Sequence, residues 1–147
     1  MKKFLIINGP NINLLHLRDK EIYGDSSLEN IENECIQLAK ELNIKVEFRQ
    51  SNSEGGIVEE IQQAIGKFDG IIINAAGYTH TSVAIRDALE IFDGKKLELH
   101  ISNIFKRESF RHNSLISQMC DAQISGLGTD GYSIALLAIN GMVKKGK

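Results

Sequence analysis

The sequence predicts an α/β fold built on a parallel β-sheet, and three observations lead to this prediction. Short apolar segments alternate with segments in which apolar residues recur every three to four positions. Polar, turn-forming residues follow the apolar segments. The chain has 147 residues, of which 42% are hydrophobic and 24% are charged, and this suits one domain with a real core.

Five segments are expected to form strands, and a helix is expected after each of the last four strands and between the first two. The expected strands are residues 4–7, 44–48, 70–73, 96–101 and 122–125, the last of them weak. The expected helices are residues 28–42, 57–65, 82–92, 110–119 and 132–142. Parallel strands need such crossover helices, which then cover both faces of the sheet.

At this size the natural strand order is 2-1-3-4-5, that of a flavodoxin-like three-layer sandwich. Ligands of such sheets bind beyond the carboxyl ends of the strands, where the order reverses between strands one and three. The chain leaves these two strands at residues 8–13 and at Asn74, and both exits are polar. We find no internal repeat and no linker, so residues 1–147 are expected to form a single catalytic domain.

Composition and charge exclude several classes of function. The net charge of −2 argues against a nucleic-acid surface, which needs a basic face. No apolar run approaches the ~20 residues that span a bilayer, and no signal peptide is expected. Cys35 and Cys120 lack metal or redox spacing and are interpreted as free thiols of a cytoplasmic protein. No His or Cys set has zinc spacing, so no metal is expected.

Residues 14–27, which we call the lid segment, interrupt the alternation of strands and helices. The segment is long for a loop, exposed and charged, and is expected to be a mobile cover over the crevice. It carries Arg18 and Tyr23. A tyrosine has an ordinary pKa of about 10, so its use as a base near neutral pH requires a neighbouring cation. The alternative is a surface arginine and a packed tyrosine without catalytic roles.

Glu98 and His100 lie two positions apart on the fourth strand, so their side chains point to the same face. A carboxylate beside a histidine favours the imidazolium form and fixes the ring, which suits a general acid. The alternative is a half-buried ion pair at a strand end. Ile101 and Ser102 follow, at a turn whose backbone N–H groups could hold a carboxylate.

Further polar residues are expected at the same end of the sheet. Asn74 and His80 lie on the connection after the third strand, and Asp87 lies in the helix that follows. Arg107 and Arg111 follow the fourth strand and suggest an anionic or polyhydroxylated ligand, unless they form only a solvated face.

Residues 126–131 (GLGTDG) match the dinucleotide fingerprint G-x-G-x-x-G, but too little chain follows for the next strand and its acidic residue. We therefore interpret these glycines as a tight turn with close helix packing, and expect no nicotinamide cofactor.

Together these motifs make the chain resemble the type II 3-dehydroquinate dehydratases, over essentially its whole length. The resemblance rests on residues 8–15, 18–24, 50–55, 74–89, 98–103, 107–112 and 126–132. The chain departs from the family pattern in two places. It lacks a glycine before and a proline after the lid arginine, and residues 74–77 read Asn-Ala-Ala-Gly where Asn-Pro-Gly-Ala is frequent.

The resemblance implies dehydration of 3-dehydroquinate to 3-dehydroshikimate without a cofactor, in the shikimate pathway of aromatic amino acid biosynthesis or in quinate catabolism. It implies that Tyr23 is the base, that Arg18 activates it, and that Asn13 holds a water near the enolate oxygen. His100 is the implied acid, oriented by Glu98.

The resemblance also implies how the substrate and the subunits are held. The implied substrate-binding residues are Asn74, His80, Arg107, Arg111 and the backbone of Ile101 and Ser102. Asp87 is implied to reach the substrate of a neighbouring subunit, in a homododecamer built from trimers.

A flavodoxin-like binding module is the alternative to an enzyme. A flavin carrier should have a hydroxyl-rich phosphate loop after the first strand, and this chain has residues 8–13 (NGPNIN) there. A signalling receiver should have acidic residues where Asn8 and Asn74 stand. Both alternatives are therefore less favoured than the dehydratase.

Overall fold

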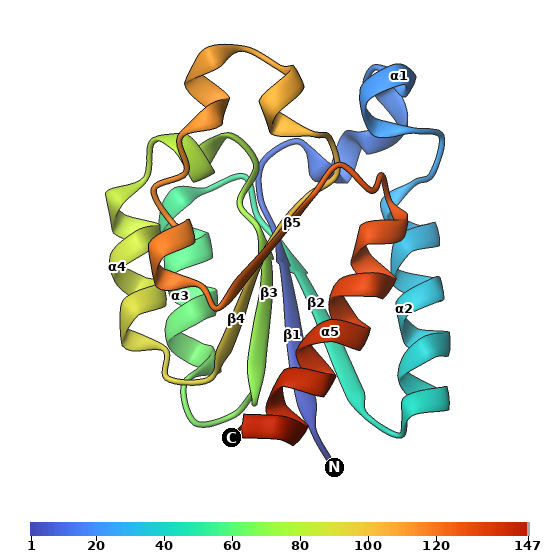
Figure 1. The fold of residues 1–147 in the computed structure, drawn as a ribbon, viewed down its shortest axis with the longest axis vertical. Helices are drawn as coiled ribbons and strands as arrows, with labels where there is room; N and C mark the ends of the chain where they lie inside the picture. The colour runs from blue at the N-terminus through green and yellow to red at the C-terminus, as the bar shows by residue number, and fades with distance from the viewer. Residues whose placement is uncertain (147) are drawn as a thin grey trace.

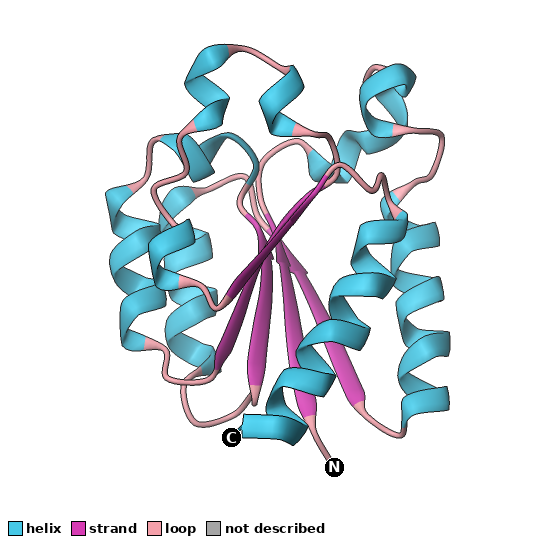
Figure 2. Ribbon diagram, viewed as in Figure 1, coloured by secondary structure: helices cyan, strands magenta, loops and turns pink. Residues whose placement is uncertain are grey.

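The computed structural model describes the backbone of residues 1–146 and the side chains of residues 1–143. Five parallel strands form one sheet in the order β2-β1-β3-β4-β5, which confirms the predicted topology. The strands are β1 (Lys3–Asn8), β2 (Lys45–Gln50), β3 (Gly70–Asn74), β4 (Lys95–His100) and β5 (Ala122–Ser125). Figure 2 shows them side by side in the middle of the molecule.

Four longer helices cover the two faces of the sheet, which makes a three-layer sandwich (Figure 1). They are α2 (Leu28–Leu42), α3 (Glu54–Ala64), α4 (Val83–Ile91) and α5 (Asp130–Gly146). Helices α2 and α5 lie on one face, and α3 and α4 lie on the other. None of the helices in the described part of the chain has the length and apolar character needed to cross a membrane.

The two faces of the sheet have separate cores because side chains alternate along each strand. On β1, Phe4 and Ile6 pack toward α2 and α5, whereas Leu5 and Ile7 pack toward α3 and α4. Every residue of β3 is buried. A central strand that is covered on both faces therefore reads in the sequence as a continuous apolar run.

Serine side chains set the start of three helices. Ser27, Ser53 and Ser82 precede α2, α3 and α4, and each side-chain oxygen accepts a hydrogen bond from a backbone N–H in the first turn. Each of these bonds satisfies one N–H group that has no partner inside the helix. The chain therefore turns from strand or loop into helix at defined positions.

Two sequence predictions differ from the structure. Residues 110–119 do not form one helix but two short 3₁₀ turns, Ser109–His112 and Ser117–Met119. The lid segment is not a plain loop, because it contains part of the 3₁₀ helix Ile12–Leu17 and all of the short helix α1 (Lys20–Tyr23). Its charged residues are mostly exposed, as expected, but Tyr23 is buried against the core. The mobility of this segment stays a prediction.

Candidate active site

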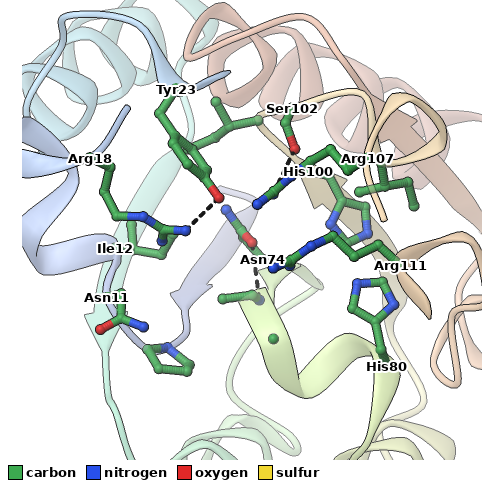
Figure 3. A pocket seen from close by; sticks show the side chains of 15 residues that line it. Asn11, Ile12, Arg18, Tyr23, Asn74, His80, His100, Ser102, Arg107 and Arg111 are labelled. Carbon is green, nitrogen blue, oxygen red and sulfur yellow. Dashed lines mark hydrogen bonds between the residues drawn. The ribbon is translucent and has the colours of Figure 1, made fainter. Parts of the chain in front are cut away.

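A cavity of about 120 Å³ lies at the carboxyl ends of the strands, where the exits of β1 and β3 meet (Figure 3). This is the place that the strand order predicts. The lining residues come from the loop after β1, the lid segment, and the ends of β3 and β4 with the connections that follow them. They are Pro10, Asn11, Ile12, Arg18, Tyr23, Asn74, Ala76, Gly77, His80, His100, Ile101, Ser102, Ile104, Arg107 and Arg111.

Most of the predicted site residues meet in this cavity. They are Arg18, Tyr23, Asn74, His80, His100, Ile101, Ser102, Arg107 and Arg111. Glu98 lies behind His100, fully buried, and reaches the cavity only through that ring. Asp87 is exposed on α4 and does not line the cavity of its own chain.

The side chain of Asn13 does not line the cavity, and its role near the enolate oxygen stays a prediction. Asn13 is exposed, and its Oδ1 accepts a hydrogen bond of 3.3 Å from Nε2 of Gln50. Asn11 lines the cavity instead, with a left-handed backbone at φ 73°. Asparagine adopts this conformation more readily than most residues, and this preference is the sequence signal that could have singled out Asn11.

Arg18 and Tyr23 form a close pair on one side of the cavity (Figure 3). Nη2 of Arg18 donates a 2.5 Å hydrogen bond to the phenol oxygen, and the guanidinium carbon lies 4.1 Å from the ring centre. The guanidinium of Arg107 is 5.3 Å from the same ring centre. Two guanidinium groups thus lie against one phenol, which is the geometry that a tyrosine acting as a base requires.

Local structure explains why the pair meets. Asp19 caps α1 by accepting a hydrogen bond from the backbone N–H of Glu21, and Gly24 ends the helix with φ 79°. The single helical turn between them carries Tyr23 back over the cavity, while Arg18 lies just before the cap. A short capped turn thus places two residues that are five positions apart beside the same cavity.

His100 and Glu98 form the second close pair, on β4. The imidazole Nε2 lies 2.5 Å from Oε2 of the carboxylate, and both side chains are buried. The hydroxyl of Ser117 donates a hydrogen bond to the other carboxylate oxygen. Burial raises the pKa of Glu98, but these hydrogen bonds and the charge of His100 outweigh it and hold the pKa below its ordinary value.

A second histidine lies close to this pair. The rings of His80 and His100 are stacked with 6.3 Å between their centres. Nδ1 of His80 lies 3.0 Å from the carbonyl oxygen of Asn113. Because a carbonyl oxygen only accepts, Nδ1 must carry the proton, and a neutral ring presents Nε2 as an acceptor. Burial, together with nearby positive charges, lowers the pKa of His80 and favours this neutral form.

The cavity suits an anionic ligand. Its described lining includes Arg18, Arg107 and Arg111 but no carboxylate. Nη1 of Arg107 donates a 3.2 Å hydrogen bond to Oγ of Ser102, and Nε of Arg111 donates a 2.7 Å bond to Oε1 of Glu108. These partners fix two guanidinium groups at the mouth of the site, where arginine can bind a carboxylate through two N–H groups.

The glycine-rich turn supports the backbone beside His100. Gly126 and Gly128 have φ values of 91° and 65°, and their N–H groups donate to the carbonyl oxygens of His100 and Ile101. A Cβ on Gly131 would lie 3.0 Å from Leu99. The interpretation as a tight turn with close helix packing is therefore confirmed.

The arrangement can carry out proton transfer at two points of one ligand. It offers a phenol with cationic neighbours on one side and an imidazole with a carboxylate on the other, with arginines between them. Among the described residues, no three His, Cys, Asp or Glu side chains are grouped so that they could hold a metal ion.

Comparison with known proteins agrees with this chemistry. The sequence model of the family "Dehydroquinase class II" matches residues 2–140. A "3-dehydroquinate dehydratase" of Endomicrobium trichonymphae is 54% identical over 136 residues, which cover 92% of this chain and 95% of the relative. A "3-dehydroquinate dehydratase" of Campylobacter jejuni is 50% identical over 137 residues, covering 93% of this chain and 86% of the relative.

Solved structures give the same answer. The type II dehydroquinase of Butyrivibrio crossotus is 48% identical and superposes with a TM-score of 0.92, covering 95% of this chain and 97% of that one. The enzyme of Propionibacterium acnes is 36% identical with a TM-score of 0.91, covering 99% and 98%. The chain belongs to the class II dehydroquinase family.

Proposed function

We propose that this protein is a type II 3-dehydroquinate dehydratase, a hydro-lyase of the shikimate pathway that converts 3-dehydroquinate to 3-dehydroshikimate by an anti elimination. The same reaction would serve quinate catabolism. One observation carries the proposal: a tyrosine paired with an arginine and a histidine paired with a glutamate line one cavity. Family membership and the names of the relatives support it.

The first step is removal of the proton at C2, next to the ketone. The Tyr23 oxygen, as a phenolate, takes this proton, and the electron pair of the C–H bond moves toward the ketone oxygen to form an enolate. Arg18 stabilises the phenolate through its 2.5 Å hydrogen bond. We assign to Asn11, which lines the cavity, the role that the sequence suggested for Asn13: it holds a water at the enolate oxygen.

The second step is departure of the C1 hydroxyl. His100 donates a proton to the leaving oxygen as the C1–O bond breaks, the enolate collapses to a conjugated enone, and water is released. Glu98 keeps the imidazole in place through its hydrogen bond, and Ser117 holds Glu98 by donating to the other carboxylate oxygen. The base lies on the lid and the acid lies on β4, on opposite sides of the cavity. The C2 proton and the C1 hydroxyl group are therefore removed from opposite faces of the ring.

The remaining residues of the cavity hold the substrate. Arg107 and the backbone of Ile101 and Ser102 are suited to the carboxylate, while Asn74, His80 and Arg111 are suited to the ring hydroxyls. No metal or organic cofactor takes part in the proposed steps, because the ketone already makes the C2 proton acidic.

The assembly and the location of the protein belong to the same proposal. We propose one catalytic domain, residues 1–147, that assembles in the cytoplasm as a homododecamer built from four trimers. Asp87 is exposed on α4, which suits contact with a neighbouring subunit. Light scattering after gel filtration should give the mass of twelve chains, and a monomer with full activity would exclude this part of the proposal.

The test of function is an absorbance assay for the enone. The purified protein, treated with a chelator and free of nucleotide, should convert 3-dehydroquinate at a rate proportional to enzyme concentration. The variant Tyr23→Phe is the matched control, because it keeps the ring and loses only the phenol oxygen. Absence of enone with the unaltered protein would rule the proposal out.

A further inference from the structure

Two asparagines share one tyrosine beneath the cavity. Asn8 ends β1 and Asn74 ends β3, and the two residues are partners in the β1–β3 register. Their side chains point to the same face as Ile6 and Ile72, two positions earlier on each strand. Tyr132, in the first turn of α5, packs into the core on that face. The tyrosine thus lies where both strand ends can reach it.

Two consecutive hydrogen bonds link the three side chains. The hydroxyl of Tyr132 donates to Oδ1 of Asn8 at 2.6 Å, and Nδ2 of Asn74 donates to the Tyr132 oxygen at 2.9 Å. Exposed fractions of 0%, 1% and 3% for Asn8, Tyr132 and Asn74 exclude solvent as a replacement partner. In such surroundings, loss of one partner leaves the others unsatisfied at a considerable cost.

A backbone N–H group fixes which groups donate and which accept in these hydrogen bonds. The N–H of Ala76 donates to Oδ1 of Asn74 at 3.2 Å, and a backbone N–H can only donate. The amide oxygen of Asn74 must therefore face Ala76, and its nitrogen must face Tyr132. Burial raises the pKa of Tyr132, so the phenol keeps its proton and donates it to Asn8. One N–H of Asn74 then remains, in a residue that lines the cavity.

We propose that Tyr132 is a positioning residue of the active site: its hydroxyl holds the Asn74 amide so that the remaining N–H donates to an oxygen of the bound substrate. Tyr132 itself does not line the cavity. The inference rests on the proposed function for the identity of the substrate, but the orientation of Asn74 is a property of the protein alone.

The kinetic test compares the unaltered protein with Tyr132→Phe, Asn74→Ala and the double variant. Tyr132→Phe should raise KM for 3-dehydroquinate about tenfold, the effect expected when one binding hydrogen bond is misaligned, and leave kcat within about twofold. In the Asn74→Ala background it should raise KM no further, because Tyr132 acts through Asn74. An unchanged KM in the single variant, or an equal rise in both backgrounds, would overturn the proposal.

A matched control separates positioning from packing. Ile139→Val alters another fully buried residue of α5 that makes no polar contact with the site. It should lower Tm and leave KM unchanged. A rise in KM for this control as large as that for Tyr132→Phe would show that any loosening of α5 has the same effect, and the proposal would fail.

A second measurement needs neither activity nor a variant. In nuclear magnetic resonance spectra of the unaltered protein, the side-chain amide proton of Asn74 that is hydrogen-bonded to Tyr132 should exchange with deuterated water far more slowly than those of the exposed Asn113. Equal exchange would contradict the inference. Absence of turnover together with slow exchange would count against the proposed function and leave the orientation of Asn74 supported, so the two failures are distinguishable.

Discussion

The lid and the end of β4 hold their proposed catalytic groups in different ways. On β4, Glu98 and His100 are buried in a strand, with Ser117 donating a second hydrogen bond to the carboxylate of Glu98. On the lid, Arg18 and Tyr23 depend on one short helix, and Arg18 remains partly exposed. The acid side is therefore built into the sheet, whereas the base side depends mainly on the contact between two side chains. Substitutions on the lid should therefore lower kcat and leave Tm nearly unchanged, whereas substitutions on β4 should change both kcat and Tm.

Tyr23→Phe should show the largest effect. Removal of the phenol oxygen eliminates the proposed base, and kcat should fall about 10³-fold, as is typical for loss of a general base. The phenyl ring keeps its packing against the core, so Tm should change by no more than about 2 °C. Steady-state kinetics and calorimetry on the same preparation measure both. Turnover within tenfold of the unaltered protein would remove Tyr23 from the mechanism.

Arg18→Ala should come next, with kcat lower by about 10²-fold, because the phenolate loses its nearest positive charge. Arg18→Lys is the matched control and should recover part of the rate, since it returns a charge without the planar guanidinium. Equal rates for the alanine and lysine variants would mean that the charge is not what matters.

Glu98→Gln should lower kcat about tenfold and also change stability, which distinguishes β4 from the lid. The pKa of Glu98 is held below its ordinary value, so the folded state binds its proton at lower pH than the unfolded chain does. The stabilisation is therefore complete above the ordinary pKa of a glutamate and is lost as the pH falls through the folded-state value.

Thermal unfolding from about pH 7 to about pH 3 measures this effect. The Tm difference between the unaltered protein and Glu98→Gln should shrink toward the acid end of the series. A constant difference across the series would show that ionisation of Glu98 does not stabilise the fold.

Ala76→Gly should give the smallest effect, and its sign is informative. Ala76 follows β3 with φ 54°, a left-handed conformation that costs a non-glycine residue about 1 kcal/mol. Glycine removes this strain, and it also increases the entropy of the unfolded chain, which lowers stability. The relief of strain is expected to be the larger effect, so Tm should rise by about 2 °C. Ala75→Gly is the control, because Ala75 has an ordinary φ of −76° and should lose stability. A lower Tm for Ala76→Gly would contradict the strain argument.

The two central strands, β1 and β3, could be predicted from the sequence because each is an apolar run that ends at an asparagine. The two short turns that stand in place of the expected 110–119 helix could not be predicted. The apolar spacing of this segment is that of a helix, but local hydrogen bonds favour turns. Oγ of Ser114 accepts from the N–H groups of Ile116 and Ser117, and Leu115 N–H donates to the carbonyl oxygen of Thr79. The bonds of Ser114 favour a turn over a helix, and the backbone bond of Leu115 goes to a residue that is distant in sequence.

Site residues could be predicted where strand periodicity places neighbouring side chains on the same face. They were missed where their position depends on an unusual backbone conformation or on the path of a loop. Glu98 and His100 share a face by strand periodicity alone. The choice between Asn11 and Asn13 depended on a left-handed φ, and the contribution of Ser117 depended on a segment folding back to β4. Neither feature leaves a periodic pattern in the sequence.

Parallel strands give the molecule two unlike ends. The proposed catalytic groups lie where the strands finish, whereas the amino terminus and the carboxyl end of α5 both lie at the opposite edge, as Figure 1 shows. A tag, a fused partner protein or a link to a solid support attached at either end therefore extends away from the cavity. The chain can be immobilised or joined to another enzyme without covering the entrance through which its substrate must pass.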